Sequence, residues 1–202
     1  MPAGFEDSDV RSVFLVGARV ALIREYIAAM RSEKPRKWGV LLSGPNGVGK
    51  SGVGLLTFLA CFAQRLMAVY LPQGSAWVQA ARDDRGDAFF LEQLVKQNAD
   101  LIAANSLLLP VFLPFFRDTE ELGSAAMRRF TKVLELNHRL AVGIVLDEAQ
   151  AITKAVEQPA VGGKLDDKSV SASNYFRFQW YNWEVRPAIY FVRMDVASSH
   201  GE

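Results

Sequence analysis

Eight residues of this chain, numbers 44 to 51, have the order that a polyphosphate-binding loop requires. They read Gly-Pro-Asn-Gly-Val-Gly-Lys-Ser, which fits the pattern G-x-x-x-x-G-K-[ST]. Glycines let the backbone wrap closely around a phosphate, so that its N–H groups point at phosphate oxygens. The expected nucleotide-binding residues are Gly44, Pro45, Asn46, Gly47, Val48, Gly49, Lys50, Ser51 and Gly52.

Two side chains at the end of this loop would carry chemistry. Lys50 would reach the β- and γ-phosphates, where its charge assists catalysis, and the Ser51 hydroxyl would ligate Mg²⁺. The alternative is an ordinary glycine-rich turn. The apolar run 38–43 before the loop and the apolar, helix-forming segment after it favour a nucleotide site, because a strand, a loop and a helix are the order that this chemistry needs.

A second acidic site follows an apolar run near residue 140. Residues 140–146 lead directly into Asp147 and Glu148, the arrangement known as Walker B. Asp147 would hold Mg²⁺ through water, Glu148 would activate the attacking water, and Gln150 could help to place that water or could lie on the surface. The alternative is that the Asp-Glu pair caps a helix. The phosphate loop earlier in the chain favours the catalytic interpretation.

The reaction class follows from what accompanies these motifs. The sequence contains no Asn-Lys-x-Asp motif, which usually reads the base in a GTPase, and a Glu directly after the Walker B Asp is rare in small-molecule kinases. We therefore expect ATP and Mg²⁺ as cofactors and hydrolysis as the reaction. Positioning and charge stabilisation would carry most of the catalysis.

The elements around the motifs predict an α/β fold with a parallel sheet. The apolar run 140–146 does not alternate with polar residues, as expected for a strand that is buried on both faces. We expect strands at 38–43, 67–71, 140–146 and 188–193, and helices at 18–30, 50–66, 89–108 and 125–136. This arrangement is a P-loop NTPase core with flanking helices.

The expected domain organisation is one core, 13–202, after a flexible N-terminus, 1–12. The Gly-, Ser-, Lys- and Asp-rich segment 157–174 is expected to be a mobile insertion. The segment 107–116 is too short, and too interrupted by proline, to span a membrane, so we expect a buried loop or a short helix. The alternative is a patch that faces a membrane or a partner. The sequence ends soon after the last expected strand, so a lid domain is expected to be absent.

Composition narrows the class further. The chain has 202 residues, of which 50% are hydrophobic and 22% charged, which is ordinary for one soluble domain. Its formal net charge of +1 gives no support for a nucleic-acid partner, although a local patch stays open. The single cysteine, Cys61, excludes a disulfide within the chain. No signal peptide is seen, so an intracellular location, cytoplasmic or nuclear, is expected.

Four segments together resemble a known family. They are 40–51, 69–72 with Trp77, 145–150 and 193–200. They are similar to the P-loop ATPase module of Crinkler-type effectors and retrotransposon hot spot proteins, which is itself similar to AAA+ and STAND ATPases. A weaker resemblance is to the mitoribosomal small-subunit GTP-binding protein.

The resemblance implies a regulatory ATPase that is often joined to a nuclease-like domain and acts in a nucleus. The chain lacks the translocation header of the effectors, and delivery into a host cell is implied only if the effector resemblance holds. The segment after the last strand, 198–200, could contain a phosphate sensor. An arginine finger could come from Arg128, Arg129, Arg186 or Arg193.

Three functions therefore agree with the sequence. The first is a weak regulatory ATPase of AAA+ or STAND type that binds ATP and Mg²⁺. The second is a nucleotide-binding interaction module that does not hydrolyse ATP. The third is a fragment of a nucleic-acid-associated ATPase, which the near-neutral net charge disfavours. Self-association is open in each case.

Overall fold

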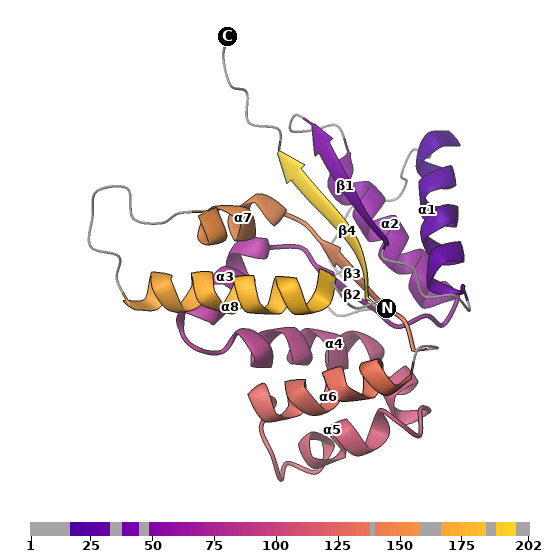
Figure 1. Ribbon diagram of the computed structural model, residues 1–202. Coiled ribbons are helices and arrows are strands. Elements are labelled where there is room, and N and C mark those ends of the chain that lie inside the picture. The colour runs from indigo at the N-terminus through magenta and orange to yellow at the C-terminus, as the bar shows by residue number, and fades with distance from the viewer. Residues whose placement is uncertain are drawn as a thin grey trace, which may run out of the picture.

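The computed structural model describes residues 17–32, 38–44, 49–137, 140–157, 167–184 and 189–196. Over these ranges the chain has an α/β fold, with a sheet of four parallel strands and eight helices (Figure 1). The strands are β1 (Trp38–Gly44), β2 (Ala68–Leu71), β3 (Val142–Leu146) and β4 (Ile189–Val196), and their order across the sheet is β1-β4-β3-β2. The predicted parallel α/β sheet is confirmed.

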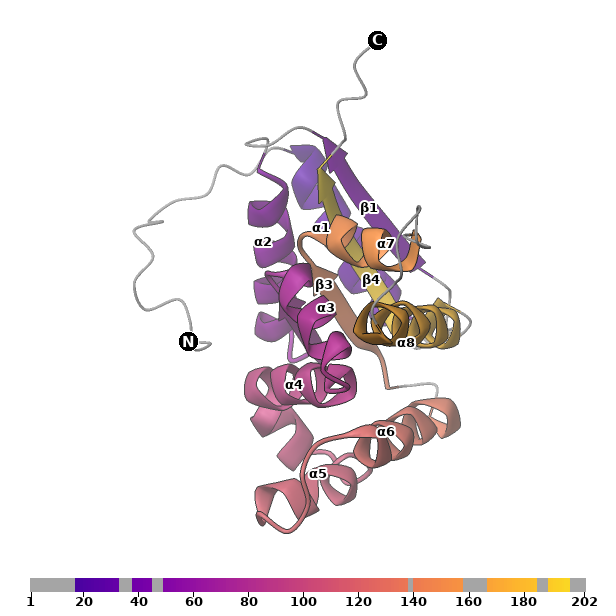
Figure 2. The same cartoon turned by 90° about the vertical axis from the view of Figure 1, so that its left-hand side faces the viewer.

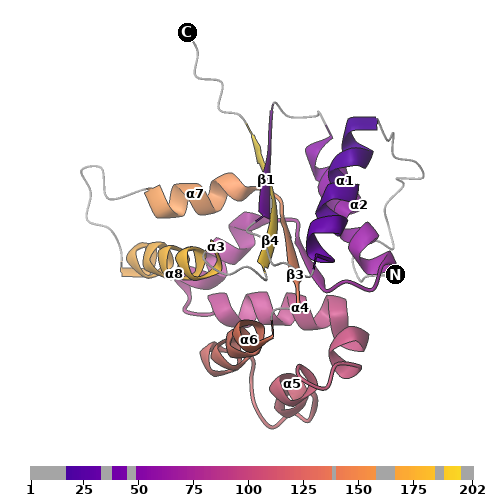
Figure 3. The same ribbon diagram turned by 45° about the vertical axis from the view of Figure 1, so that its right-hand side comes forward.

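Helices cover both faces of this sheet. On one face lie α1 (Gly17–Met30) and α2 (Lys50–Ala63), and on the other lie α3 (Gly74–Arg82), α7 (Ala149–Glu157) and α8 (Asp167–Glu184) (Figure 3). Because both faces are covered, all five residues of β3 are buried. This burial is the physical reason for its unbroken apolar sequence.

The remaining helices form a lobe beyond the end at which the strands begin. They are α4 (Gly86–Ala103), α5 (Leu109–Phe116) and α6 (Ser124–Leu136), and they lie below the sheet in Figures 1 and 2. Their apolar side chains, such as Phe90 and Phe130, join the core that also packs under α3, α7 and α8. The lobe therefore extends the core at the end of the sheet away from the phosphate loop.

Two side-chain amides protect the outer edge of β2. The Asn98 carboxamide donates to Ala68 O (2.7 Å) and accepts from Ala68 N (3.1 Å). The Gln97 carboxamide donates to Tyr70 O (3.0 Å) and accepts from Tyr70 N (2.8 Å). A non-helical backbone at Asn98 (φ −133°) kinks α4 at this point. The two amides take the place of a neighbouring strand and occupy groups that would otherwise be free to pair with another chain.

The structure adds detail to two segments of the sequence-based expectation. Residues 109–116, expected as a loop or short helix, form α5, whose Val111 and Phe112 are buried; Pro110 is tolerated because it lies in the first turn. Residues 167–174, expected to belong to a mobile insertion, form the first half of α8. Ala172 and Phe176 on this helix are buried, and that burial outweighs the polar composition. Residues 158–166 and 1–16 lie outside the described residues.

Within the described ranges, no helix combines the length and the apolar character that crossing a membrane requires.

Candidate functional site

The predicted phosphate loop joins β1 to α2. Gly44 ends β1 and Lys50 begins α2, and the predicted loop residues Pro45, Asn46, Gly47 and Val48 lie outside the described residues. Gly49, directly before the helix, has φ +83°, a left-handed conformation that glycine adopts without steric cost. The chain therefore enters α2 through a turn that only glycine accommodates easily.

The first turn of α2 is suited to an anion. No acidic residue lies in it, and no side chain within the described part of the chain caps it. The first N–H groups of the helix, with the positive end of its dipole, are therefore directed toward the place where a phosphate would lie. Lys50 is half-buried and Ser51 is exposed.

Close packing at Gly54 sets where this turn lies. A Cβ on Gly54 would overlap the end of the Met194 side chain and would lie 3.2 Å from Val145 Cγ1. The absence of a side chain thus lets α2 approach β3 and β4 closely. Ser51 lies one turn before Gly54, and Asp147 lies two residues after Val145. This contact brings the end of the phosphate loop to the end of β3.

The strand register agrees with this arrangement. Leu41 on β1 and Leu146 on β3 both align with Arg193 on β4, which lies between them. Neighbouring strands are about 4.8 Å apart, so β1 and β3 are separated by roughly 10 Å. The two motifs therefore follow strands that lie on either side of β4.

The turn after β3 is held firmly by backbone hydrogen bonds. Asp147 N donates to Leu71 O (2.9 Å), and Gly74 N donates to Asp147 O (3.1 Å). A Cβ on Gly74 would lie 2.6 Å from Glu148 O and 3.0 Å from Asp147 O. The segment that follows β2 therefore packs directly against the backbone of the two acidic residues, and this packing requires glycine at position 74.

The Glu148 carboxylate has a specific partner. Ser75 Oγ donates to Glu148 Oε2 at 2.8 Å. Glu148 itself has φ +54°, an unfavourable conformation for a residue with a side chain. Asp147 Oδ1 accepts from Glu148 N (2.9 Å). Glu148 directly precedes α7, and its backbone O accepts from Ala151 N at 2.9 Å.

Tyr70 reports on the surroundings of Asp147. Burial, with a smaller contribution from the charge of Asp147, raises the pKa of Tyr70 to about 12. The Tyr70 ring stacks on Phe58 of α2, with ring centroids 6.0 Å apart. The Asp147 carboxylate, which is half-buried, thus lies close enough to Tyr70 to influence its ionisation.

The other predicted residues differ in position. Gln150 lies in the first turn of α7, and its Oε1 is buried with no hydrogen-bond partner within the described part of the chain. Arg193 is half-buried on β4, with its guanidinium 5.2 Å from the centroid of the Phe191 ring. Arg128 and Arg129 lie on α6, in the lobe at the opposite end of the sheet (Figure 1). Arg186 and residues 198–200 lie outside the described residues.

The donor set fits Mg²⁺ rather than an all-protein metal site. Among the described residues, no group of three or more His, Cys, Asp or Glu side chains could hold a metal ion. Mg²⁺ commonly uses one or two protein oxygens and completes its shell with phosphates and water. The Ser51 hydroxyl and the Asp147 carboxylate offer oxygen atoms of the kind that Mg²⁺ prefers.

A cavity elsewhere in the molecule has the wrong charge for a nucleotide. It measures about 550 Å³ and lies between the start of α4 and the loop that joins α5 to α6. Its lining includes Asp84, Asp87, Glu92 and Glu121, with Arg85 as the single cation. These carboxylates would repel a polyphosphate. This cavity is therefore not a candidate nucleotide site.

Gly74 and Ser75 contact the two acidic residues but belong to neither sequence motif. Their position in the sequence could have indicated this contact. Both residues follow β2, and residues that follow neighbouring parallel strands meet at the carboxyl end of the sheet. Their roles depend on distances to Asp147 and Glu148 that the sequence does not contain.

Comparison with known proteins adds little to this geometry. No protein-family model matches the chain, and no curated protein matches it. Among solved structures, the chain is similar to C. elegans PCH-2, with 14% identity and a TM-score of 0.33. The match covers 92% of this chain and 38% of that one. At this score the similarity carries no conclusion about function.

Proposed function

We propose that this chain is an ATP- and Mg²⁺-binding P-loop domain that acts as a weak regulatory ATPase of AAA+ or STAND type. The observation that carries the proposal is the close approach of α2 to β3 at Gly54 and Val145. It brings a loop with a phosphate-binding sequence beside a strand that ends in two carboxylates. The kinship with Crinkler-type modules belongs to the proposal and rests on the sequence resemblance.

Binding is assigned to the loop and to the first turn of α2. Lys50 holds the β- and γ-phosphates through charge-assisted hydrogen bonds, which are among the stronger ones in proteins. The backbone N–H groups from Gly49 to Gly52 complete the cradle. These contacts bind the phosphate chain whatever the base, so they set affinity and leave the choice between ATP and GTP to other residues.

Hydrolysis is assigned to the turn after β3. Mg²⁺, held by Ser51 and by Asp147 through water, would neutralise charge on the phosphates. Glu148 orients the attacking water and accepts its proton, and Gln150 assists in placing that water. These groups must be positioned before the reaction, because an error of about 1 Å in such a site can cost roughly 100-fold in rate.

One contact supports slow rather than fast turnover. The Ser75 hydroxyl donates to the Glu148 carboxylate at 2.8 Å, and this bond engages one of the two oxygens that could take a proton from water. The same contact favours the second candidate, a nucleotide-binding interaction module that hydrolyses little or no ATP. Turnover separates the two candidates. Stimulation by DNA or RNA would indicate the third, a nucleic-acid-associated ATPase.

Nucleotide binding is the first experiment. Thermal unfolding should be followed with ATP, GTP or ADP, each with and without Mg²⁺. At a ligand concentration 100 times Kd, binding stabilises a protein by about 2.7 kcal/mol, which is easily measured. Lys50→Ala should abolish the shift, whereas the control Lys132→Ala, on the exposed surface of α6, should preserve it. Equal shifts for wild type and Lys50→Ala would reject the site.

Turnover is the second experiment. We expect wild-type ATP hydrolysis below the common enzyme range of about 1–10³ per second. The rate should be measured over a range of protein concentrations, because a neighbouring copy could supply an arginine finger worth about 10³–10⁵-fold. Fast hydrolysis that does not depend on protein concentration would contradict the weak-ATPase proposal.

A further inference from the structure

An arginine from the first helix reaches the phosphate loop. The Arg19 guanidinium lies against Gly49: its Nη1, Nη2 and Cζ atoms are 3.2, 3.3 and 3.5 Å from the position that a Cβ on Gly49 would occupy. Gly49 directly precedes Lys50. The end of the loop is therefore flanked by two cationic side chains that come from different helices.

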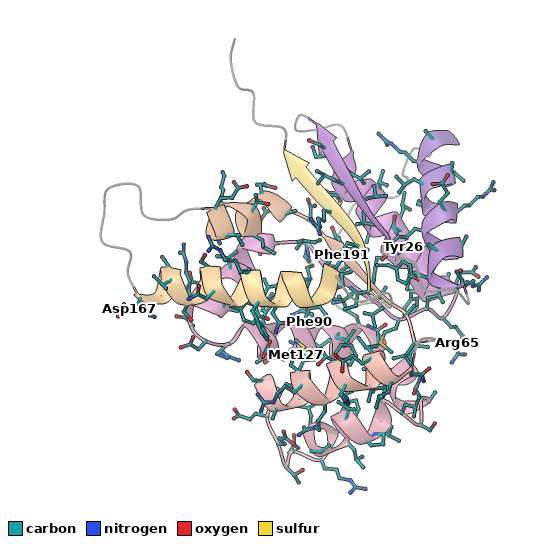
Figure 4. All side chains as sticks on the ribbon, viewed as in Figure 1. Tyr26, Arg65, Phe90, Met127, Asp167 and Phe191 are labelled. Atoms are coloured by element: carbon teal, nitrogen blue, oxygen red, sulfur yellow. The ribbon has the colours of Figure 1, made fainter. Side chains whose placement is uncertain are left out.

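The fold holds the helix that carries Arg19 firmly in place. Tyr26 is fully buried, and its hydroxyl donates to Tyr190 O on β4 at 3.1 Å (Figure 4). The same hydroxyl lies 2.5 Å from the position of a Cβ on Gly143, and Met30 is also close to that position. Glycine at position 143 thus lets α1 pack directly on β3. The second half of α1 is therefore anchored to the sheet.

The anchoring of Tyr26 also fixes the position of Arg19 on α1. Arg19 lies seven residues before Tyr26, close to two full turns, so the two side chains share one face of α1. Two turns span about 10 Å along the helix axis. Because α1 starts beside the end of β1 (Figure 1), these two turns and the long arginine side chain cover the distance from Tyr190, near the start of β4, to Gly49. The position of Arg19 is thus built into the packing of α1.

We propose that Arg19 is a second cationic ligand for the phosphate chain of the bound nucleotide, an inference that rests on the proposed function. ATP keeps a net negative charge after Mg²⁺ binds, which Lys50 alone does not neutralise. A guanidinium suits this task, because its planar fork of donors matches phosphate oxygens in pairs. Arg19 contacts phosphate rather than the base, since it lies at the turn that begins α2.

The proposal predicts a specific pattern of affinities. Arg19→Ala should weaken binding of both ATP and inorganic tripolyphosphate by about 10- to 100-fold, the usual effect of losing a charge-assisted hydrogen bond. Arg19→Lys should recover part of the loss, because it restores the charge without the paired geometry. A contact to the base would weaken ATP and leave tripolyphosphate unchanged.

Isothermal titration of the full chain with Mg-ATP and with tripolyphosphate tests this pattern. The matched control is Arg24→Ala, an exposed arginine on the same helix about 140° around from Arg19. Arg24→Ala should bind both ligands within twofold of wild type. Thermal unfolding without ligand checks that Arg19→Ala is folded. If that variant does not fold, Arg19→Lys is used, and we expect a smaller but parallel loss for both ligands.

The outcomes separate this inference from the proposed function. If wild type does not bind Mg-ATP, both fail. If wild type binds, Lys50→Ala does not, and the Arg19 variants bind both ligands like Arg24→Ala, the nucleotide site stands and the role of Arg19 is overturned. A loss confined to ATP would also overturn it, because the contact would then be to the nucleoside. Parallel losses for ATP and tripolyphosphate support it.

Discussion

Replacement of Gly74 by alanine should damage the candidate site through one methyl group. The new Cβ would lie 2.6 Å from Glu148 O and 3.0 Å from Asp147 O. Both atoms are backbone, so neither can rotate away as the end of a flexible side chain could. The chain must instead move the start of α3 or the turn that carries the two acidic residues. Either movement also strains the hydrogen bond from Gly74 N to Asp147 O.

The size of the effect follows from two opposing contributions. Forcing a methyl group into a filled space costs about 1–3 kcal/mol. Alanine is a better helix former than glycine by up to about 1 kcal/mol, and less at the first helical position. The net loss is about 1–2 kcal/mol, which for a chain of this size lowers Tm by about 2–8 °C. Turnover should fall by about 10- to 100-fold, because Glu148 is displaced.

Thermal unfolding and ATP hydrolysis, measured on the same samples, test this prediction. The control is Gly123→Ala at the start of α6, where no described atom lies within 4 Å of the new Cβ. It should leave both Tm and turnover close to wild type. If Gly74→Ala keeps the wild-type Tm and rate, the close packing of α3 on this turn does not exist as described. If it lowers Tm but not turnover, Glu148 does not depend on this contact.

Three further predictions concern other parts of the molecule. Glu148→Gln should still bind ATP but lose at least about 100-fold in turnover, because the base is removed; a wild-type rate would exclude Glu148 as that base. Asn98→Ala should lower the urea midpoint by an amount equivalent to about 2–3 kcal/mol, because both backbone polar groups of Ala68 lose their partners. The control is Gln93→Ala on the same helix, and an equal change in both variants would contradict the protection of the β2 edge by Asn98. Burial raises the pKa of Cys61 to about 12 from the ordinary 9, so this group contributes stability that is complete below pH 9 and lost as pH rises toward 12. In the native protein at pH 8 the thiol should react with a thiol reagent far more slowly than in urea, and equal rates would show that it is accessible.

Much of the fold could be predicted from local pattern. Each of the four strands was expected from a short apolar run, and the strand at 140–146 was recognised as buried on both faces because polar residues do not interrupt it. The helical structure of segments 109–116 and 167–174 was harder to predict from the sequence. Whether a proline-containing or polar segment is helical depends on what it buries, and the burial of Phe112 and Phe176 comes from other parts of the chain.

The sequence by itself determined which residues could carry the chemistry. The spacing of Gly49, Lys50 and Ser51 is local, and so is the position of Asp147 and Glu148 at the end of an apolar run. A short backbone segment sets the geometry of each motif, so each can be found without knowledge of the rest of the chain.

The tertiary structure alone decided what surrounds those residues. Arg19 meets Gly49 because α1 packs on the sheet, and Ser75 meets Glu148 because β2 lies beside β3. These pairs are 30 and 73 residues apart in the chain. Contacts of this kind arise from the packing of whole elements. The residue types and the sequence around each residue do not predict which distant residue it contacts.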